Sequence, residues 1–183
     1  MIICLIGFMG CGKSSVGRQL SKLLCCPFMD LDDVIVQREG RAIPEIFSTD
    51  GEGAFRQMEL QTLQDIILSE AKDLAVLALG GGTVMTEECR EIVKEKTACV
   101  YMKATVETLM EHLEGQTEGR PMLSGGSGSG RQNGTENSAL RARIEGLMER
   151  RAAVYEDTAH HIIVTDGMSV EQVCSKIREK LEI

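Results

Sequence analysis

The feature that most constrains this chain is the segment at residues 7–14, which reads GFMGCGKS. It matches the pattern G-x-x-x-x-G-K-[ST] of a phosphate-binding loop. Residues 1–6 are all apolar, as in a buried strand of a parallel sheet. Apolar residues follow the loop at helical spacing, at Val16, Leu20, Leu23 and Leu24. Because the pattern requires the order strand, glycine loop, helix, this context predicts a nucleotide site rather than a chance glycine-rich turn.

The residue types in this loop suit the binding of a polyphosphate. Its glycines permit backbone angles and close approaches that a side chain would block. The N–H groups of the loop can then face the phosphates, next to the positive N-terminus of the following helix. The Lys13 ammonium would reach the β- and γ-phosphates, and the Ser14 hydroxyl would be a ligand of Mg²⁺.

Length, charge and cysteine content exclude several classes of protein. A chain of 183 residues favours one domain, over residues 1–183. The net charge of -8, without a stripe of Lys and Arg, argues against a nucleic-acid partner. No apolar run reaches the length of a membrane span, and residues 1–6 read as a core strand rather than a signal peptide. The 7 cysteines form no C-x-x-C pair and indicate reduced thiols of a cytoplasmic protein. We expect a monomer whose most accessible thiol is Cys11.

Further apolar runs predict strands at residues 27–29, 74–79, 98–102 and 161–165. Helical patterns lie between them, at residues 31–39, 44–47, 52–69, 87–94, 105–113 and 138–155, and a last helix begins after Ser169. Strands that alternate with helices predict an α/β fold of three layers, a five-stranded parallel sheet with helices on both faces.

The segment at residues 114–138 has the weakest pattern, and Gly and Ser alone fill residues 125–130. Such a tract is either a flexible linker or a loop over the site. Too little chain follows it for a second domain, and the last strand should belong to the same sheet. We therefore expect a mobile lid over the site.

Polar or glycine clusters follow the second and third predicted strands. Asp30 and Asp32 come after the second strand, and Gly80, Gly81 and Gly82 come after the third. Ligands of such sheets collect at the carboxyl ends of the strands, so both clusters should adjoin the phosphate-binding loop. One carboxylate can hold Mg²⁺ through water while the other accepts a proton, unless the two only form an acidic helix start. The glycines would allow a ligand to approach the backbone, unless they form only a loose turn.

Together these motifs resemble those of the shikimate kinase family. The resemblance spans nearly the whole chain and implies the fold of nucleoside monophosphate kinases, with sheet order 2-3-1-4-5. It also implies transfer of the γ-phosphoryl group of ATP to the 3-hydroxyl of shikimate, with Mg²⁺, in aromatic amino acid biosynthesis. The matching segments, in the family's order, are residues 7–20, 29–35, 47–59, 79–82, 120–123 and 150–155.

The resemblance also implies roles for individual residues. Asp32 would bind ring hydroxyls and act as the base, while Asp30 would lie near Mg²⁺ with Ser14. Arg56 and Arg151 would bind the carboxylate of shikimate. Glu59 would orient Arg56. The backbone of Gly80, Gly81 and Gly82 would contact shikimate. Arg120 would be the lid arginine that meets the transferring phosphoryl group. The catalytic set would be Lys13, Asp32 and Arg120, and the ATP-binding set Gly10, Cys11, Gly12, Lys13, Ser14, Ser15 and Arg120.

Arginine suits these roles chemically, because its planar fork can bind a carboxylate through two hydrogen bonds and its charge stabilises a transferring phosphoryl group. The chain departs from the family in a longer lid between Arg120 and Arg151. It also has no arginine at residues 110–119, where only His112 could contact adenine. Rival interpretations are another small-molecule kinase, such as a gluconate or nucleotide kinase, and a nucleotide-binding switch that hydrolyses little.

Overall fold

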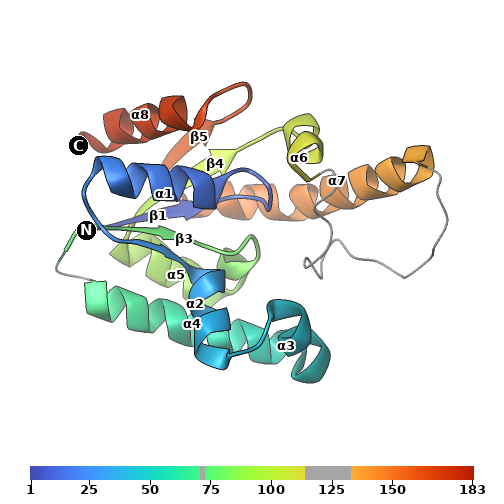
Figure 1. The fold of residues 1–183 in the computed structure, drawn as a ribbon, viewed down its shortest axis with the longest axis horizontal. Helices are drawn as coiled ribbons and strands as arrows, with labels where there is room; N and C mark the ends of the chain where they lie inside the picture. The colour runs from blue at the N-terminus through green and yellow to red at the C-terminus, as the bar shows by residue number, and fades with distance from the viewer. Residues whose placement is uncertain (71–72, 114–132) are drawn as a thin grey trace.

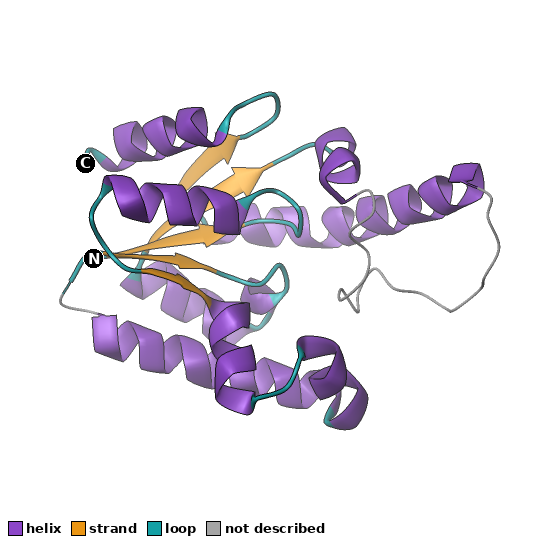
Figure 2. Cartoon of the chain, viewed as in Figure 1, coloured by secondary structure: helices purple, strands orange, loops and turns teal. Residues whose placement is uncertain are grey.

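In residues 1–70, 73–113 and 133–183, which the computed structural model describes, the chain forms a five-stranded parallel sheet between layers of helices (Figure 2). The strand order is β2-β3-β1-β4-β5, so the expected order 2-3-1-4-5 is confirmed. Each neighbouring pair of strands is parallel. The strands are β1 (Ile2–Ile6), β2 (Phe28–Asp30), β3 (Ala75–Ala78), β4 (Ala98–Lys103) and β5 (His161–Val164).

Helices cover both faces of this sheet (Figure 1). The helices are α1 (Lys13–Leu23), α2 (Leu31–Glu39), α3 (Ile43–Thr49), α4 (Gly51–Glu70), α5 (Glu87–Lys96), α6 (Val106–Leu113), α7 (Asn133–Thr158) and α8 (Val170–Leu181), with a 3-10 turn η1 (Thr83–Met85). Helices α1 and α8 pack together on one face, and α4, α5 and α7 cover the other. None of the described helices is both long and apolar enough to cross a membrane.

Side chains of the central strand β1 supply both halves of the core, because successive residues of a strand point to opposite faces. Ile3 and Leu5 belong to the cluster under α1 and α8. Ile2, Cys4 and Ile6 belong to the cluster under α4, α5 and α7. All five are at most 2 % exposed, which explains why the strand is an unbroken apolar run in the sequence.

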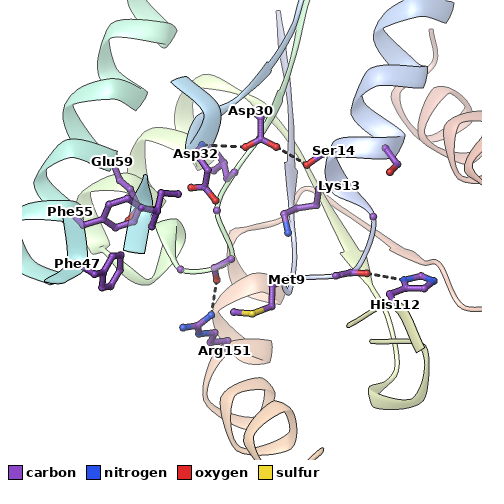
Figure 3. A pocket seen from close by; sticks show the side chains of 18 of the residues that line it. Met9, Lys13, Ser14, Asp30, Asp32, Phe47, Phe55, Glu59, His112 and Arg151 are labelled. Carbon is purple, nitrogen blue, oxygen red and sulfur yellow. Dashed lines mark hydrogen bonds between the residues drawn. The ribbon is translucent and has the colours of Figure 1, made fainter. Parts of the chain in front are cut away.

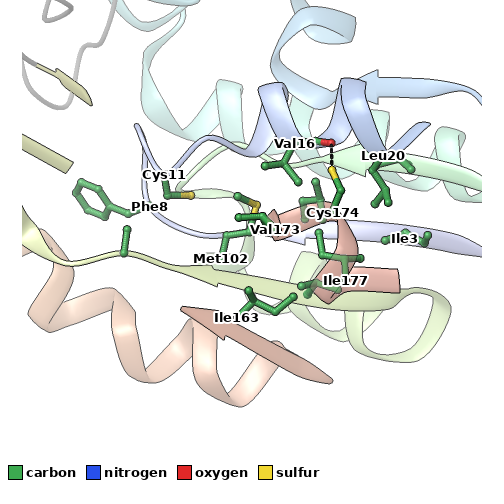
Figure 4. Close-up of a cluster of buried hydrophobic side chains, with 14 of the residues drawn as sticks. Ile3, Phe8, Cys11, Val16, Leu20, Met102, Ile163, Val173, Cys174 and Ile177 are labelled. Atoms are coloured by element: carbon green, nitrogen blue, oxygen red, sulfur yellow. Dashed lines mark hydrogen bonds between the residues drawn. The ribbon is translucent and has the colours of Figure 1, made fainter. Parts of the chain in front are cut away.

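The cluster under α1 and α8 anchors the helix that begins with the phosphate-binding loop (Figure 4). Val16 and Leu20 of α1 face Val173 and Ile177 of α8 across this cluster. The Cys174 thiol also donates a weak hydrogen bond, 3.6 Å long, to the carbonyl of Val16. Helix α1, and with it the end of the loop, is therefore fixed by buried apolar contacts.

The main difference from the predicted elements is the start of α7. It begins at Asn133 instead of residue 138, so the predicted lid at residues 114–138 overlaps a helix at its end. The segment Asn-Gly-Thr-Glu-Asn has poor helix propensity, but extending an existing helix costs little compared with starting one. The rest of that lid, residues 114–132, lies outside the described residues and includes Arg120.

A carboxylate from the β5–α8 connection holds Thr105, the residue that caps the start of helix α6. The Asp166 Oδ1 accepts hydrogen bonds from the Thr105 N–H at 2.8 Å, the Thr105 hydroxyl at 2.8 Å and the Thr108 hydroxyl at 2.6 Å. Burial raises the pKa of the Asp166 carboxyl, but these hydrogen bonds outweigh it and lower the pKa overall. These hydrogen bonds join two loops at the carboxyl edge of the sheet.

We predict that Asp166→Ala lowers the free energy of unfolding by about 1 kcal/mol at pH 7, because the start of α6 loses its hydrogen bonds to this carboxylate. The folded-state pKa of Asp166 lies below the unfolded one, so these hydrogen bonds stabilise the fold above a pH of about 4, and this contribution is lost as pH falls through the folded-state pKa. Urea unfolding at several pH values measures the effect. Asp157→Ala, which removes an exposed partner of Lys94, is the control and should cost under about 0.5 kcal/mol. A loss at Asp166 no larger than the control would show that its hydrogen bonds do not stabilise the start of α6.

Candidate active site

A cavity of about 730 Å³ lies at the carboxyl ends of the strands, beside the phosphate-binding loop (Figure 3). Its position agrees with the rule that ligands of open α/β sheets bind at this edge. Apolar side chains of α3 and α4 form one wall, where the rings of Phe47 and Phe55 pack 4.8 Å apart. The predicted site residues that line it are Gly10, Gly12, Lys13, Ser14, Ser15, Asp30, Asp32, Arg56, Gly80, Gly81, Gly82 and Arg151.

The phosphate-binding loop has the conformation that its glycines were expected to allow. Gly7, Gly10 and Gly12 have φ angles of 146°, 83° and 90°. The Lys13 ammonium donates hydrogen bonds to the carbonyls of Gly7 at 2.9 Å and Phe8 at 3.0 Å, so it lies across the loop. This arrangement places a positive charge in the cavity wall before any ligand binds.

Cys11 is the predicted loop residue that does not line the cavity. Its side chain is only 4 % exposed and belongs to the core cluster under α1 and α8, so the expectation that it is the most accessible thiol is wrong. The side chain turns away from the loop surface into apolar packing, and among the cysteines Cys25 is the exposed one. The Cys11 N–H donates to the Phe8 carbonyl at 3.3 Å within the loop.

Asp30 starts helix α2 and also contacts the phosphate-binding loop. Its Oδ1 accepts from the Asp32 N–H at 3.2 Å and so caps α2, which is the acidic helix start. Its Oδ2 accepts from the Ser14 hydroxyl at 2.6 Å (Figure 3). A carboxylate and a hydroxyl thus meet beside Lys13.

These two oxygens fit a magnesium ion that is shared with a substrate. Among the described residues, no group of three or more His, Cys, Asp or Glu side chains could hold a metal. Mg²⁺ is commonly bound by one or two protein oxygens, several waters and substrate phosphates rather than by a cage of protein ligands. The pair Ser14 and Asp30, next to a phosphate-binding loop, has this character.

Asp32 is a carboxyl group with a strongly raised pKa. The pKa lies at about 7, raised first by burial and then by the charges of Asp30 and Glu59, while Lys13 opposes them. Gly80 lies so close that a Cβ there would be 2.8 Å from the Asp32 Oδ1. Glycine at this strand end therefore makes room for the carboxyl group, which is a reason for the triple glycine beyond a loose turn.

The buried Glu59 carboxylate holds Arg56 in the cavity wall. Glu59 is 1 % exposed and accepts hydrogen bonds from the Arg56 Nη1 and, over 2.6 Å, from the Thr83 hydroxyl. The Arg56 Nη2 also donates to Glu52 Oε1 at 3.0 Å. Gly82 lies against this guanidinium, because a Cβ there would be 2.7 Å from both terminal nitrogens. Arg56 is therefore oriented by Glu59, as the family resemblance implied.

Arg151 lies on the opposite side of the glycine segment from Asp32. Its side chain is only 5 % exposed, although sequence pattern alone favours a surface position near the end of α7. The Nη1 donates to the Gly81 carbonyl at 3.2 Å, and the guanidinium lies 5.9 Å from the centre of the Phe8 ring. Arg56 and Arg151 thus line one cavity, on two different helices.

The sequence prediction missed three contacts of the site. One is the hydrogen bond from the Thr83 hydroxyl to Glu59; the only sequence signal for it is that Thr83 directly follows the triple glycine. Tyr155 donates a hydrogen bond to the Gly81 carbonyl and lies inside the matched segment at residues 150–155. His112 was considered only for adenine, but its Nδ1 lies 2.8 Å from the Gly10 carbonyl and so joins α6 to the loop. Arg120 lies outside the described residues, so its placement stays a prediction.

The fold and cavity together define a P-loop kinase, with a nucleotide-phosphate site and an acceptor pocket at the same sheet edge. Comparison with known proteins gives the family. The family model described as shikimate kinase matches residues 9–182. A shikimate kinase of Thermus thermophilus is 40% identical over 179 residues, which cover 98% of this chain and 89% of that protein.

Solved structures agree with this match. The shikimate kinase of Acinetobacter baumannii in complex with shikimate has a TM-score of 0.83 and 30% identity, and the match covers 99% of this chain and 93% of that one. The shikimate kinase of Aquifex aeolicus has a TM-score of 0.76 and 32% identity, with coverage of 100% and 96%. The chain belongs to the shikimate kinase family.

We predict that Asp32 titrates with a midpoint of about 7 in the protein without nucleotide and Mg²⁺, for the electrostatic reasons above. The carboxyl ¹³C chemical shift of labelled aspartate measures it, and Asp32→Asn assigns the signal. Glu59→Gln should lower the midpoint, because it removes one of the charges that raise this pKa. A wild-type midpoint near the ordinary value of 3.8 would contradict the assigned environment.

Proposed function

We propose that this protein transfers the γ-phosphoryl group of ATP to the 3-hydroxyl of shikimate, giving ADP and shikimate 3-phosphate. The observation that carries this proposal is the single cavity in which Lys13 of the phosphate-binding loop, Asp32 and the Glu59-bound Arg56 come together. Phosphoryl transfer needs little covalent chemistry from a protein, so a kinase site consists mainly of positioning and charge. Membership of the shikimate kinase family supports the identity of both substrates.

The loop supplies the donor half of this site. N–H groups of the loop at Gly10, Cys11 and Gly12, with the N-terminus of α1, would surround the phosphates of ATP. Lys13 would exchange its bonds to the loop carbonyls for the β- and γ-phosphates. Ser15 lines the cavity at the first turn of α1 and would add a further polar contact.

Ser14 and Asp30 would hold Mg²⁺, Ser14 directly and Asp30 through water. The 2.6 Å contact between their oxygens supports this pairing, because both are hard donors next to the phosphate site. Bound there with ATP, the ion would neutralise charge on the phosphates. Asp30 also caps α2, the helix that carries Asp32. The same side chain would therefore hold Mg²⁺ and fix the start of that helix.

The acceptor half would bind shikimate by its carboxylate and hydroxyls. Arg56 and Arg151 would take the carboxylate, since a guanidinium fork matches a carboxylate with two hydrogen bonds. The backbone at Gly80, Gly81 and Gly82 would add contacts, and no N–H of these three residues has an acceptor among the described residues. Asp32 would bind the ring hydroxyls.

The chemical step follows from these positions. Asp32 would take the proton of the 3-hydroxyl as the hydroxyl oxygen bonds to the γ-phosphorus. The bond from that phosphorus to the bridging oxygen of ADP breaks, and the electron pair leaves with ADP. A base with a pKa near the working pH suits this task. Lys13 would stabilise the developing negative charge, and we assign Arg120 the same role on the transferring group.

We further propose that residues 1–183 form one domain that acts as a monomer in the cytoplasm, without nucleic-acid or membrane partners. The net charge of -8 supports the absence of a nucleic-acid partner. The free state of all seven cysteines fits a reducing compartment. The segment at residues 114–138 would act as a lid that excludes water, since water would otherwise accept the phosphoryl group.

We predict that Lys13→Ala weakens MgATP binding by about 10- to 100-fold, because charge-assisted hydrogen bonds to phosphate are lost. Titration calorimetry measures the affinity, and circular dichroism verifies folding. The matched control is Lys22→Ala, which removes an exposed lysine of the same helix and should leave the affinity unchanged. Wild-type affinity in Lys13→Ala would remove this lysine from the nucleotide site.

We predict that Asp32→Asn lowers turnover about 10²- to 10⁴-fold while MgATP affinity stays at the wild-type level. The amide keeps the shape of the side chain but cannot accept the proton. Steady-state rates of ADP release with shikimate measure the effect. Asp33→Asn changes the exposed neighbour, which pairs with Arg18 at 3.5 Å, and should retain wild-type turnover. An Asp32→Asn enzyme with more than about half the wild-type turnover would show that this carboxyl is not the base.

A further inference from the structure

Two side chains of α7 hold the carbonyl oxygen of Gly81. The Tyr155 hydroxyl donates one hydrogen bond to it, and the Arg151 Nη1 donates another over 3.2 Å. The two donors are four positions apart in the sequence and so lie on one face of the helix. A carbonyl oxygen has two lone pairs, which these two donors can occupy.

Packing in the hydrophobic core holds the Tyr155 hydroxyl in position. Tyr155 is 1 % exposed, and its ring packs against that of Tyr101 with 5.1 Å between the ring centres. Burial raises the pKa of the Tyr155 hydroxyl far above its ordinary value, against the opposing charge of Arg151. The hydroxyl therefore stays protonated and remains a donor, and a buried donor of this kind needs the acceptor that Gly81 supplies.

The orientation of one carbonyl fixes the orientation of the next amide. The described chain has no cis peptide bond, so the Gly82 N–H points away from the side on which the Gly81 carbonyl meets α7. No described residue accepts a hydrogen bond from this N–H. Gly82 also lies against the Arg56 guanidinium. The amide is thus a free donor beside a positive side chain in the cavity lining.

The phosphate-binding loop restricts the same peptide from another direction. A Cβ on Gly81 would lie 3.3 Å from the Met9 nitrogen and 3.6 Å from the Gly7 carbonyl oxygen. Without side-chain bonds to its carbonyl, a glycine pair has many backbone conformations of similar energy. Tyr155 and Arg151 select one of them.

We propose that Tyr155 is a positioning residue for the acceptor: by holding the Gly81 carbonyl it keeps the Gly82 N–H directed at an oxygen of shikimate. The proposal rests on the function proposed above. Arg151 contributes to the same carbonyl and also lines the cavity, whereas Tyr155 does not line it and lies behind it, against the Gly81 carbonyl and the Arg151 guanidinium. Removing its hydroxyl should therefore weaken acceptor binding and leave the nucleotide half of the site intact.

The test compares Tyr155→Phe with Tyr101→Phe. Both variants remove one buried phenol hydroxyl from the same stacked pair, but no hydrogen bond joins the Tyr101 hydroxyl to another described residue. In Tyr155→Phe the KM for shikimate should rise about threefold to tenfold, as expected for one lost hydrogen bond, while the KM for ATP stays within about twofold. In Tyr101→Phe both constants should stay within about twofold. An unchanged KM for shikimate in Tyr155→Phe, or an equal rise of both constants, would overturn the proposal.

A measurement on the wild-type protein covers the case in which Tyr155→Phe does not fold. The Gly82 amide should exchange rapidly in the free protein and become protected when shikimate is added, as followed by NMR. Rapid exchange of this amide in the presence of saturating shikimate would overturn the proposal. Wild-type protein that neither binds nor phosphorylates shikimate would instead contradict the proposed function, so the two failures are distinguishable.

Discussion

The part of the cavity that we propose as the acceptor half depends on one buried charge, the carboxylate of Glu59. A carboxylate that is 1 % exposed is costly unless it is paired, and Arg56 and Thr83 supply the partners. The pairing fixes a guanidinium in the cavity wall and ties α4 to the turn after the triple glycine. The same charge helps to raise the pKa of Asp32. The orientation of Arg56 and part of the rise in the pKa of Asp32 therefore come from the same carboxylate.

The topology brings this acceptor half next to the donor half. Strands β1 and β3 are neighbours and β2 lies beside β3, so the phosphate-binding loop, the triple glycine and the two aspartates emerge at one edge. Asp30 joins the halves, because it caps α2, on which Asp32 lies, and accepts from the Ser14 hydroxyl of α1. Gly81 also connects the two halves, because it lies between the phosphate-binding loop and Arg151 of α7. The two halves are therefore joined by a few short contacts.

Much of this arrangement could be predicted from the sequence. Strands buried on both faces are unbroken apolar runs, and the parallel order places the ends of β1, β2 and β3 together. Features that depend on packing between distant segments could not be predicted. The burial of Arg151 and the hydrogen bond from Tyr155 to Gly81 depend on how α7 packs against the sheet. The local sequence pattern of α7 does not predict that packing. The burial of Cys11 likewise reflects the space beneath the loop, and the start of α7 at Asn133 reflects helix propagation into a segment of poor propensity.

We propose that one cavity couples a nucleotide to a carboxylate-bearing acceptor. The most direct test of this proposal is the release of ADP by the wild-type protein with MgATP, measured with and without shikimate, together with detection of shikimate 3-phosphate. We expect that ADP release depends on shikimate and equals the phosphorylated product in amount. ADP release that is the same without shikimate, or that gluconate or a nucleoside monophosphate supports and shikimate does not, would contradict it.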